Sequence, residues 1–154
     1  VMIIDTKDAL LIADKNFSQE IKNIVSTLNK KKLKEGKQHK KMHRPWGSYL
    51  SIEESNGWQI KRIEVNPMAS LSLQMHKHRS EHWIVVDGIA EVQVGDEIKF
   101  LSKNESAFIP IECKHKLSNP SKKPLILIEV QTGDYLGEDD IIRIDDIYGR
   151  ANKS

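Results

Sequence analysis

The sequence predicts an all-β domain, built as a β-sandwich or a barrel, with a short helical appendage at its N-terminus. The 154 residues are enough for one domain plus an appendage, and 38% hydrophobic and 30% charged residues are typical of a folded globular chain. Short alternating segments separated by turn residues fill the chain after residue 44, whereas a helical period occurs only before residue 30. We therefore expect an appendage and linker over residues 1–43 and the β domain over residues 44–154.

The first 29 residues contain two short apolar pieces and one amphipathic helix. The pieces are Met2–Ile4 and Ala9–Ala13, with polar residues between them. Ser18 is a typical N-cap residue, so we expect the helix to begin after it. Apolar residues then recur with the helical period at Ile21, Ile24, Val25 and Leu28. This apolar stripe has to be buried against a neighbour.

A basic segment separates the helix from the β domain. Residues 30–44 hold eight Lys or Arg and one Glu, whereas the rest of the chain carries 16 basic and 21 acidic residues. No aromatic residue interleaves with these charges to stack on bases, so we favour a solvated linker over residues 30–43, centred on Gly36, and expect no nucleic-acid partner. No apolar run reaches the ~18 residues of a membrane span, and no secretory signal is present, so we expect no membrane partner. The single cysteine, Cys113, fits a reducing cytoplasm.

Eight alternating segments predict the strands of the β domain. Asn56-Gly57 is a strong hairpin signal, because both residues accept positive φ, and the strand Trp58–Val65 follows it. The other segments are Leu71–His76, Trp83–Val86, Ala90–Val94, Ile98–Leu101, Ala107–Ile109, His115–Leu117 and Leu125–Gln131. No Gly-rich loop joins a strand to a helix, which excludes a P-loop or dinucleotide site. Residues 135–150 have no clear period and predict an irregular tail.

Side chains that bind metals are densest between residues 73 and 82. Because side chains alternate along a strand, positions 74, 76 and 78 share one face. Glu81 opens the next strand, from which its carboxylate can return to the same pocket, and His115 stands far downstream. Imidazole, carboxylate and amide oxygen together suit one divalent first-row metal, such as Zn²⁺, Mn²⁺, Fe²⁺, Co²⁺ or Ni²⁺.

The spacing in this segment resembles the first motif of the cupin family, whose fold is a double-stranded β-helix, a jelly-roll-like barrel. Glu81 is followed by six residues and then Gly88. His76 takes the place of the second histidine of the motif, and Gln74 takes the place of the first. The opening glycine of the motif is replaced by Met68, so we expect the preceding turn to be altered.

The second cupin motif aligns with residues 110–119. Pro110, His115 and Asn119 match it, whereas Glu112 replaces its glycine, and we expect this turn to be altered too. The resemblance implies one divalent metal with the ligands Gln74, His76, Glu81 and His115. It leaves His78 as a nearby polar group or a substitute ligand.

Longer strings resemble the C-terminal cupin domain of the bifunctional mannose-1-phosphate guanylyltransferase/mannose-6-phosphate isomerase family, the type II phosphomannose isomerases. The strings are RPWGSY (44–49), LSLQMHKHRSEHWIVVDG (71–88), NESAFIP (104–110) and IEVQTGDYLGEDDIIR (128–143). Residues 1–29 resemble the segment that ends the guanylyltransferase domain of this family. The Gly-rich nucleotide signature of that domain is absent from these residues, so we do not expect guanylyl transfer from this chain alone.

The resemblance implies that the chain interconverts mannose 6-phosphate and fructose 6-phosphate through a cis-enediol(ate), in a pathway to GDP-mannose and polysaccharide. This reaction needs a Lewis acid, a base and a cation for the phosphate. Glu129, on the inward face of its predicted strand, and His78 are the candidate bases. Lys61, Arg79 and Arg143 are the candidate phosphate ligands.

Two other functions stay open at this point. The chain could be a non-catalytic sugar-binding or assembly module split from a mannose-1-phosphate guanylyltransferase, or a remnant of that enzyme kept for regulation. Cupins often pair through exposed sheet faces, so the resemblance implies a homodimer. The apolar stripe of the N-terminal helix could cover the barrel, a second copy or a guanylyltransferase domain.

Overall fold

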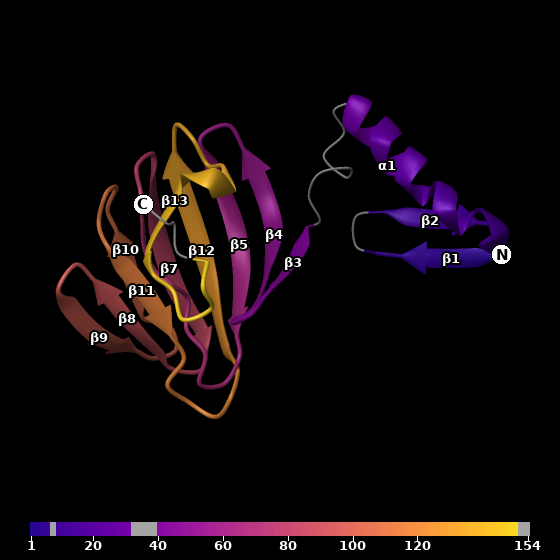
Figure 1. Cartoon of the computed structure of the whole chain (residues 1–154). Helices are drawn as coiled ribbons and strands as arrows, with labels where there is room; N and C mark the ends of the chain where they lie inside the picture. The colour runs from indigo at the N-terminus through magenta and orange to yellow at the C-terminus, as the bar shows by residue number, and fades with distance from the viewer. Residues whose placement is uncertain (7–8, 32–39, 151–154) are drawn as a thin grey trace. The chain divides into compact units, whose positions relative to one another are not determined.

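The computed structural model of the chain describes residues 1–6, 9–31 and 40–150 (Figure 1). Contacts between residues divide the chain into two units, Val1–Met42 and His43–Ser154, and each is described by itself. Residues 32–39, most of the segment predicted as a linker and including Gly36, lie outside the described residues.

The first unit contains a hairpin and a helix. Strand β1 (Met2–Asp5) pairs antiparallel with β2 (Leu10–Ala13), and a 3₁₀ helix (Lys15–Glu20) leads into α1 (Ile21–Lys30). The expectation that Ser18 caps the helix is wrong, because the residue that precedes α1 is Glu20. Asp14 caps the earlier turn instead, since its carboxylate accepts the backbone N–H of Asn16 at 2.9 Å. In the described part of the chain, no helix is long and apolar enough to cross a membrane.

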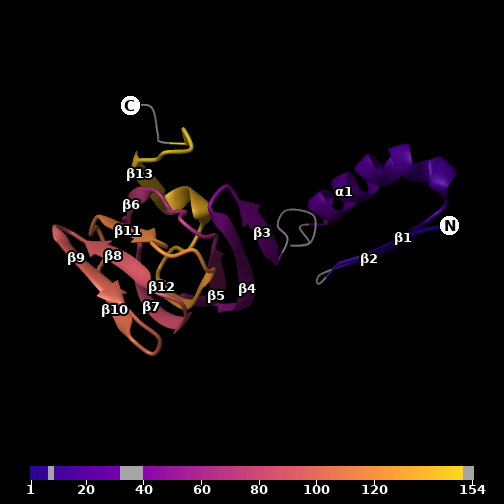
Figure 2. The same ribbon diagram turned by 90° about the horizontal axis from the view of Figure 1, so that it is seen from below.

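The second unit consists of two antiparallel sheets around a common interior (Figure 2). The larger sheet has the order β10 (Ser106–Ile109), β7 (Arg79–Asp87), β12 (Leu125–Gly133), β5 (Trp58–Val65), β4 (Gly47–Ser55) and β3 (Lys41–Arg44). The smaller sheet has the order β13 (Ile141–Asp145), β6 (Leu73–His76), β11 (His115–Ser118), β8 (Ala90–Val94) and β9 (Glu97–Leu101). The prediction of an all-β domain after residue 44 is confirmed.

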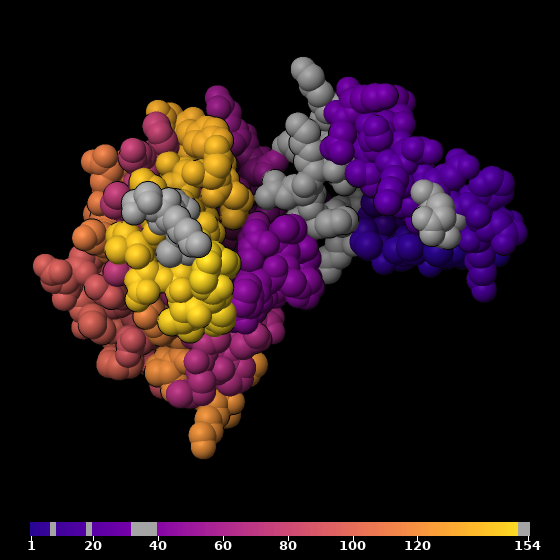
Figure 3. All heavy atoms as spheres, viewed as in Figure 1, coloured from indigo at the N-terminus to yellow at the C-terminus, as the bar shows by residue number. Residues whose placement is uncertain are grey.

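The hairpin predicted at Asn56-Gly57 joins β4 to β5, with Ser55 opposite Trp58. Only Gly57 uses the positive φ that the signal allows, at 83°. The prediction of an irregular tail is wrong, because a short 3₁₀ helix (Glu138–Asp140) and β13 follow β12. Strand β13 lies at the edge of its sheet and is only partly buried, so its sequence lacks the alternation of a strand with one covered face. In Figure 3 the segment around β13 lies on the surface of this unit.

The inward-facing residues of β12 and β5 are apolar at one end of each strand and polar at the other, so the interior has an apolar part and a polar part. The inward residues of β12 are Leu125, Leu127, Glu129 and Gln131, and all are buried. On β5, the inward Ile63 and Val65 are apolar, whereas Lys61 and Gln59 are polar. The apolar part forms the core of the domain, and the polar part positions the functional site.

The two turns in which a family glycine is replaced keep the left-handed backbone of glycine. Met68 has φ 58° and Glu112 has φ 60°. Both residues thus adopt a conformation that usually favours glycine. In this conformation the N–H of Glu112 donates to the carbonyl of His76 at 2.8 Å, which ties the turn before His115 to β6.

Candidate functional site

Two histidines and one glutamate from three strands meet in the polar part of the interior. His76 ends β6, Glu81 lies early in β7 and His115 begins β11. One ligand atom of each lies within 4.8 Å of the others. His76 Nε2 is 3.0 Å from Glu81 Oε1, and His115 Nε2 is 3.7 Å from Glu81 Oε2. All three side chains are buried.

The nitrogen atoms of this group fit a metal ion. His76 Nδ1 and His115 Nε2 are buried without a hydrogen-bond partner, and His76 Nε2 faces the carboxylate of Glu81. His115 Nδ1 lies 2.9 Å from the carbonyl of Cys113, to which it donates, so Nε2 carries the free lone pair. Burial lowers the pKa of His115 below its ordinary value, which favours the neutral imidazole that metals bind. A buried nitrogen without a partner is costly in a purely structural site.

The carboxylate of Glu81 is held from several sides. Burial alone would raise its pKa, but His76, His115 and Arg79 outweigh this effect and hold the pKa of Glu81 below its usual range. Gln131 Nε2 donates to Glu81 Oε1 at 2.8 Å. Glu81 therefore presents an ionised carboxylate in a fixed orientation.

A second buried carboxyl group, Glu129, lies beside Glu81. Its oxygens accept hydrogen bonds from Trp83 Nε1 at 3.0 Å and from Gln131 Nε2 at 2.9 Å. Burial, with the negative charge of Glu81, raises the pKa of Glu129 to about 8, although Lys61 opposes the shift. A group that gains and loses a proton near neutral pH is suited to general acid–base chemistry.

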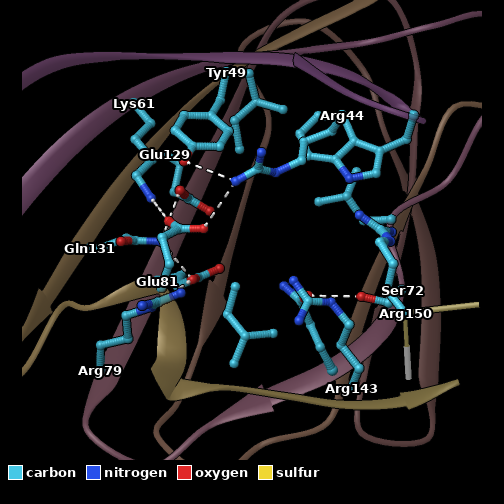
Figure 4. A pocket seen from close by; sticks show the side chains of 16 residues that line it. Arg44, Tyr49, Lys61, Ser72, Arg79, Glu81, Glu129, Gln131, Arg143 and Arg150 are labelled. Carbon is cyan, nitrogen blue, oxygen red and sulfur yellow. Dashed lines mark hydrogen bonds and ion pairs between the residues drawn. The ribbon is translucent and has the colours of Figure 1, made fainter. Parts of the chain in front are cut away.

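The two carboxyl groups, Glu81 and Glu129, border a cavity that is open to solvent (Figure 4). Carboxylates of Glu81, Glu129 and Glu138 line it. Its cationic lining comprises Arg44, Lys61, Arg79, Arg143 and Arg150. Among the described residues that line the cavity, cations thus outnumber carboxylates, which favours an anionic ligand.

The structure brings most of the predicted site residues to this cavity. Lys61 is 4% exposed and pairs with Glu138 at 2.7 Å, and Arg79 is 2% exposed and donates to the carbonyl of Gly137 at 2.9 Å. Gln74 shares the inward face of β6 with His76 and lies opposite His115, although its amide oxygen accepts a hydrogen bond from a serine hydroxyl at 3.0 Å. Arg143 on β13 also lines the cavity.

His78 is the one predicted residue that lies apart from these groups. It follows the end of β6 with a half-exposed imidazole (49%), which lies 3.5 Å from Asp134. Its backbone N–H donates to Asp140 at 3.3 Å, which fixes the turn between β6 and β7. The strand ends at His76, so the alternation expected to turn His78 inward does not extend to it.

Sequence reasoning missed four residues of the cavity. Arg44 and Tyr49 lie in the string RPWGSY, which was matched to the family without a role for either residue. Glu138 and Arg150 lie in the tail predicted to be irregular. Their signal was only the match of the surrounding strings to the family.

Comparisons with known proteins identify the family of the chain. A family model described as "Mannose-6-phosphate isomerase C-terminal" matches residues 31–146. The xanthan biosynthesis protein XanB of Xanthomonas campestris pv. campestris (strain B100) is 52% identical over 151 residues, which cover 98% of this chain and 32% of that protein. The mannose-1-phosphate guanylyltransferase of Escherichia coli (strain K12) is 48% identical, again over 98% of this chain and 32% of that protein.

The chain thus spans about a third of the length of these curated relatives. A crystal structure of an uncharacterized conserved protein with a double-stranded β-helix domain, from Klebsiella pneumoniae subsp. pneumoniae MGH 78578, matches with a TM-score of 0.56 and 17% identity. The match covers 71% of this chain and 83% of that chain, and it confirms the predicted cupin fold. By the match of the family model to most of its length, the chain belongs to the mannose-6-phosphate isomerase C-terminal family.

Proposed function

We propose that this domain is a metal-dependent isomerase that interconverts mannose 6-phosphate and fructose 6-phosphate, in the cytoplasm and in a pathway to GDP-mannose and polysaccharide. The observation that carries the proposal is the meeting of His76, Glu81 and His115 within 4.8 Å, because the Glu81 carboxylate of this group also lines a cavity rich in cations. Family membership supports the substrate class.

We assign metal binding, proton transfer and orientation of the base to different residues of the site. His76, Glu81 and His115 would hold a divalent cation, which when bound would supply the positive charge that polarises a carbonyl. Glu129 accepts the proton from C2 of the aldose and returns it to C1 of the enediol(ate), while the hydroxyl proton passes from O2 to O1, so that the carbonyl moves to C2. Trp83 and Gln131 hold the carboxyl group of Glu129 in one orientation during both transfers. Gln74 is the proposed fourth ligand.

A coupled assay of mannose 6-phosphate conversion, with and without added divalent metal, tests this proposal. We expect turnover that a chelator removes and that added Zn²⁺, Mn²⁺, Co²⁺, Fe²⁺ or Ni²⁺ restores. A fully metal-loaded sample without turnover would favour the alternative, a non-catalytic sugar-binding or assembly module split from a guanylyltransferase.

We also propose that two copies pair through the outer face of β7 and β10. Ile84, Val86 and Phe108 are 38%, 41% and 58% exposed, and Phe108 lies opposite His82 on the neighbouring strand. A second copy of the same antiparallel face can cover these side chains by two-fold symmetry. Light scattering at micromolar concentration tests the pairing, and Phe108→Glu should give a monomer. A monomeric parent protein would exclude the dimer.

The relatives' additional length makes a guanylyltransferase domain the other proposed partner. In the first unit, Ile24 and Val25 of α1 are 44% and 41% exposed, so part of the predicted apolar stripe is available to such a domain.

A further inference from the structure

The charges of Asp146 and Glu138 act on Arg143, but neither carboxylate forms an ion pair with it. Arg143 lies on β13 and lines the cavity. Its Nε is buried without a hydrogen-bond partner, and it forms no ion pair with any other described residue. A guanidinium with a buried N–H that lacks an acceptor gains a hydrogen bond when an anion reaches it.

The two other predicted phosphate ligands are already engaged by protein groups. Lys61 Nζ lies 2.7 Å from Glu138 Oε1 and 4.7 Å from the centre of the Tyr49 ring. Arg79 donates to Glu81 at 3.3 Å and to the carbonyl of Gly137 at 2.9 Å. An incoming phosphate would have to displace these partners, whereas at Arg143 it meets an open donor.

A second guanidinium is fixed in the wall of the same cavity. Asp146 accepts hydrogen bonds from Arg150 Nε at 3.0 Å and from Arg150 Nη2 at 2.7 Å. Burial lowers the pKa of Arg143, the charge of Arg150 lowers it further, and the charge of Asp146 opposes both effects, so the two cations and Asp146 lie near one another. Two like charges in one wall are stabilised by a shared anion.

The position of Arg143 relative to the metal ligands suits a hexose phosphate. Arg143 lies opposite Gln74, and Gln74 lies opposite His115, so the three form one row across β13, β6 and β11. With neighbouring strands ~4.8 Å apart, the backbones of Arg143 and His115 are separated by about 10 Å. An open-chain hexose phosphate spans a similar length from its reacting carbons to its phosphorus.

We infer that Arg143 binds the phosphate monoester of the substrate, that Arg150, held by Asp146, adds a supporting positive charge beside it, and that Lys61 and Arg79 instead hold the protein's own groups in place. This inference rests on the proposed function for the identity of the sugar, and the binding of the anion can be measured without turnover.

Inorganic phosphate, followed by ³¹P NMR titration of the metal-loaded protein, is the first probe. Arg143→Gln and Arg150→Gln should each weaken phosphate binding and raise the KM for mannose 6-phosphate by about ten- to hundredfold, as expected for lost hydrogen bonds to a charged group. Bound metal should not change. Arg62→Gln is the matched control, because Arg62 lies on the outer face of β5, paired with Glu64 at 3.0 Å. If Arg143→Gln does not fold, Arg143→Lys keeps the charge and should still raise the Kd for phosphate.

Three results would overturn the inference: no phosphate binding by the parent protein, unchanged binding in the Arg143 variants, or a loss of binding in Lys61→Gln alone. The result of this test can be distinguished from the result that tests the proposed isomerase function. Phosphate binding that depends on Arg143, in a metal-loaded protein without turnover, supports the subsite and contradicts the isomerase. Turnover with an unchanged KM in Arg143→Gln contradicts the subsite and supports the isomerase.

Discussion

Trp83 joins Glu81 to Glu129, because its indole Nε1 lies 3.1 Å from Glu81 Oε2 and 3.0 Å from Glu129 Oε1. Gln131 Nε2 bridges the same two carboxyl groups from another side, at 2.8 and 2.9 Å. Two neutral donors thus hold a proposed metal ligand and the proposed base in one rigid group. The amide of Gln131 is oriented in turn by a hydrogen bond from Gln59. A substitution at either carboxyl group therefore changes the hydrogen bonds that the other one accepts.

Loss of either histidine of the site should remove the metal. We expect His76→Ala and His115→Ala each to abolish bound metal in elemental analysis, because each removes one of the buried nitrogens that lack a protein partner. Circular dichroism should show that both variants stay folded. His82→Ala, at an exposed position on β7, is the control and should keep its metal. Stoichiometric metal in both site variants would contradict the ligand assignment.

Removal of the proposed base should lower turnover without removing the metal. Glu129→Gln preserves the shape of the side chain but cannot accept a proton, so kcat should fall by about 10²–10⁴-fold. Metal content and KM should stay close to those of the parent protein. Glu64→Gln, on the outer face of β5, should behave like the parent protein. A Glu129→Gln variant with parental kcat would assign the proton transfer to another group.

Glycine should be tolerated, and should stabilise the fold, at the two left-handed positions. Met68→Gly and Glu112→Gly remove a left-handed penalty of roughly 1–2 kcal/mol and add a chain-entropy cost of about 0.5–1 kcal/mol, so the free energy of unfolding should rise by about 0.5–1 kcal/mol. Met68→Ala keeps a Cβ at the same φ and should give no gain. Urea denaturation measures all three variants, and a loss of stability in both glycine variants would contradict the prediction.

The stability of the domain should depend on the ionisation of Glu138. Burial alone would raise its pKa, but Lys61, Arg79 and Arg44 outweigh this effect and lower the pKa below the ordinary value of 4.5. The folded state therefore binds the proton less tightly than the unfolded state, so this stabilisation is present above pH 4.5 and is lost as the pH falls below it.

The free energy of unfolding, measured at pH 7 and at pH 4, tests this dependence. Glu138→Gln should lower stability at pH 7 and reduce the difference between the two pH values. Glu53→Gln, at an exposed position of β4, is the control and should leave that difference as in the parent protein. An unchanged difference in Glu138→Gln would show that the ion pair with Lys61 does not stabilise the fold.

Much of the fold was predictable because the alternation of apolar and polar residues along a strand depends only on neighbouring positions in the sequence. Alternation in residues 125–131 placed Glu129 inward, and the spacing of His76, Glu81 and His115 placed three strands around one point. The left-handed backbone at Met68 was not predictable, because residue type indicates only a preferred φ, whereas the hydrogen bond from its N–H to the carbonyl of Ser121 at 3.1 Å depends on the whole fold. Strand β13 was missed because its pairing with β6 joins residues more than sixty positions apart.

The apolar part of the interior stabilises the fold, whereas the polar part lines the cavity and carries the proposed catalytic groups. Leu125 and Leu127 lie on the same strand face as Glu129 and Gln131, yet the first pair belongs to the core and the second to the cavity. Substitutions at the cavity end can therefore accumulate while the core keeps the scaffold intact. Such an arrangement allows one architecture to acquire new substrates by exchange of a few polar side chains, without rebuilding the barrel.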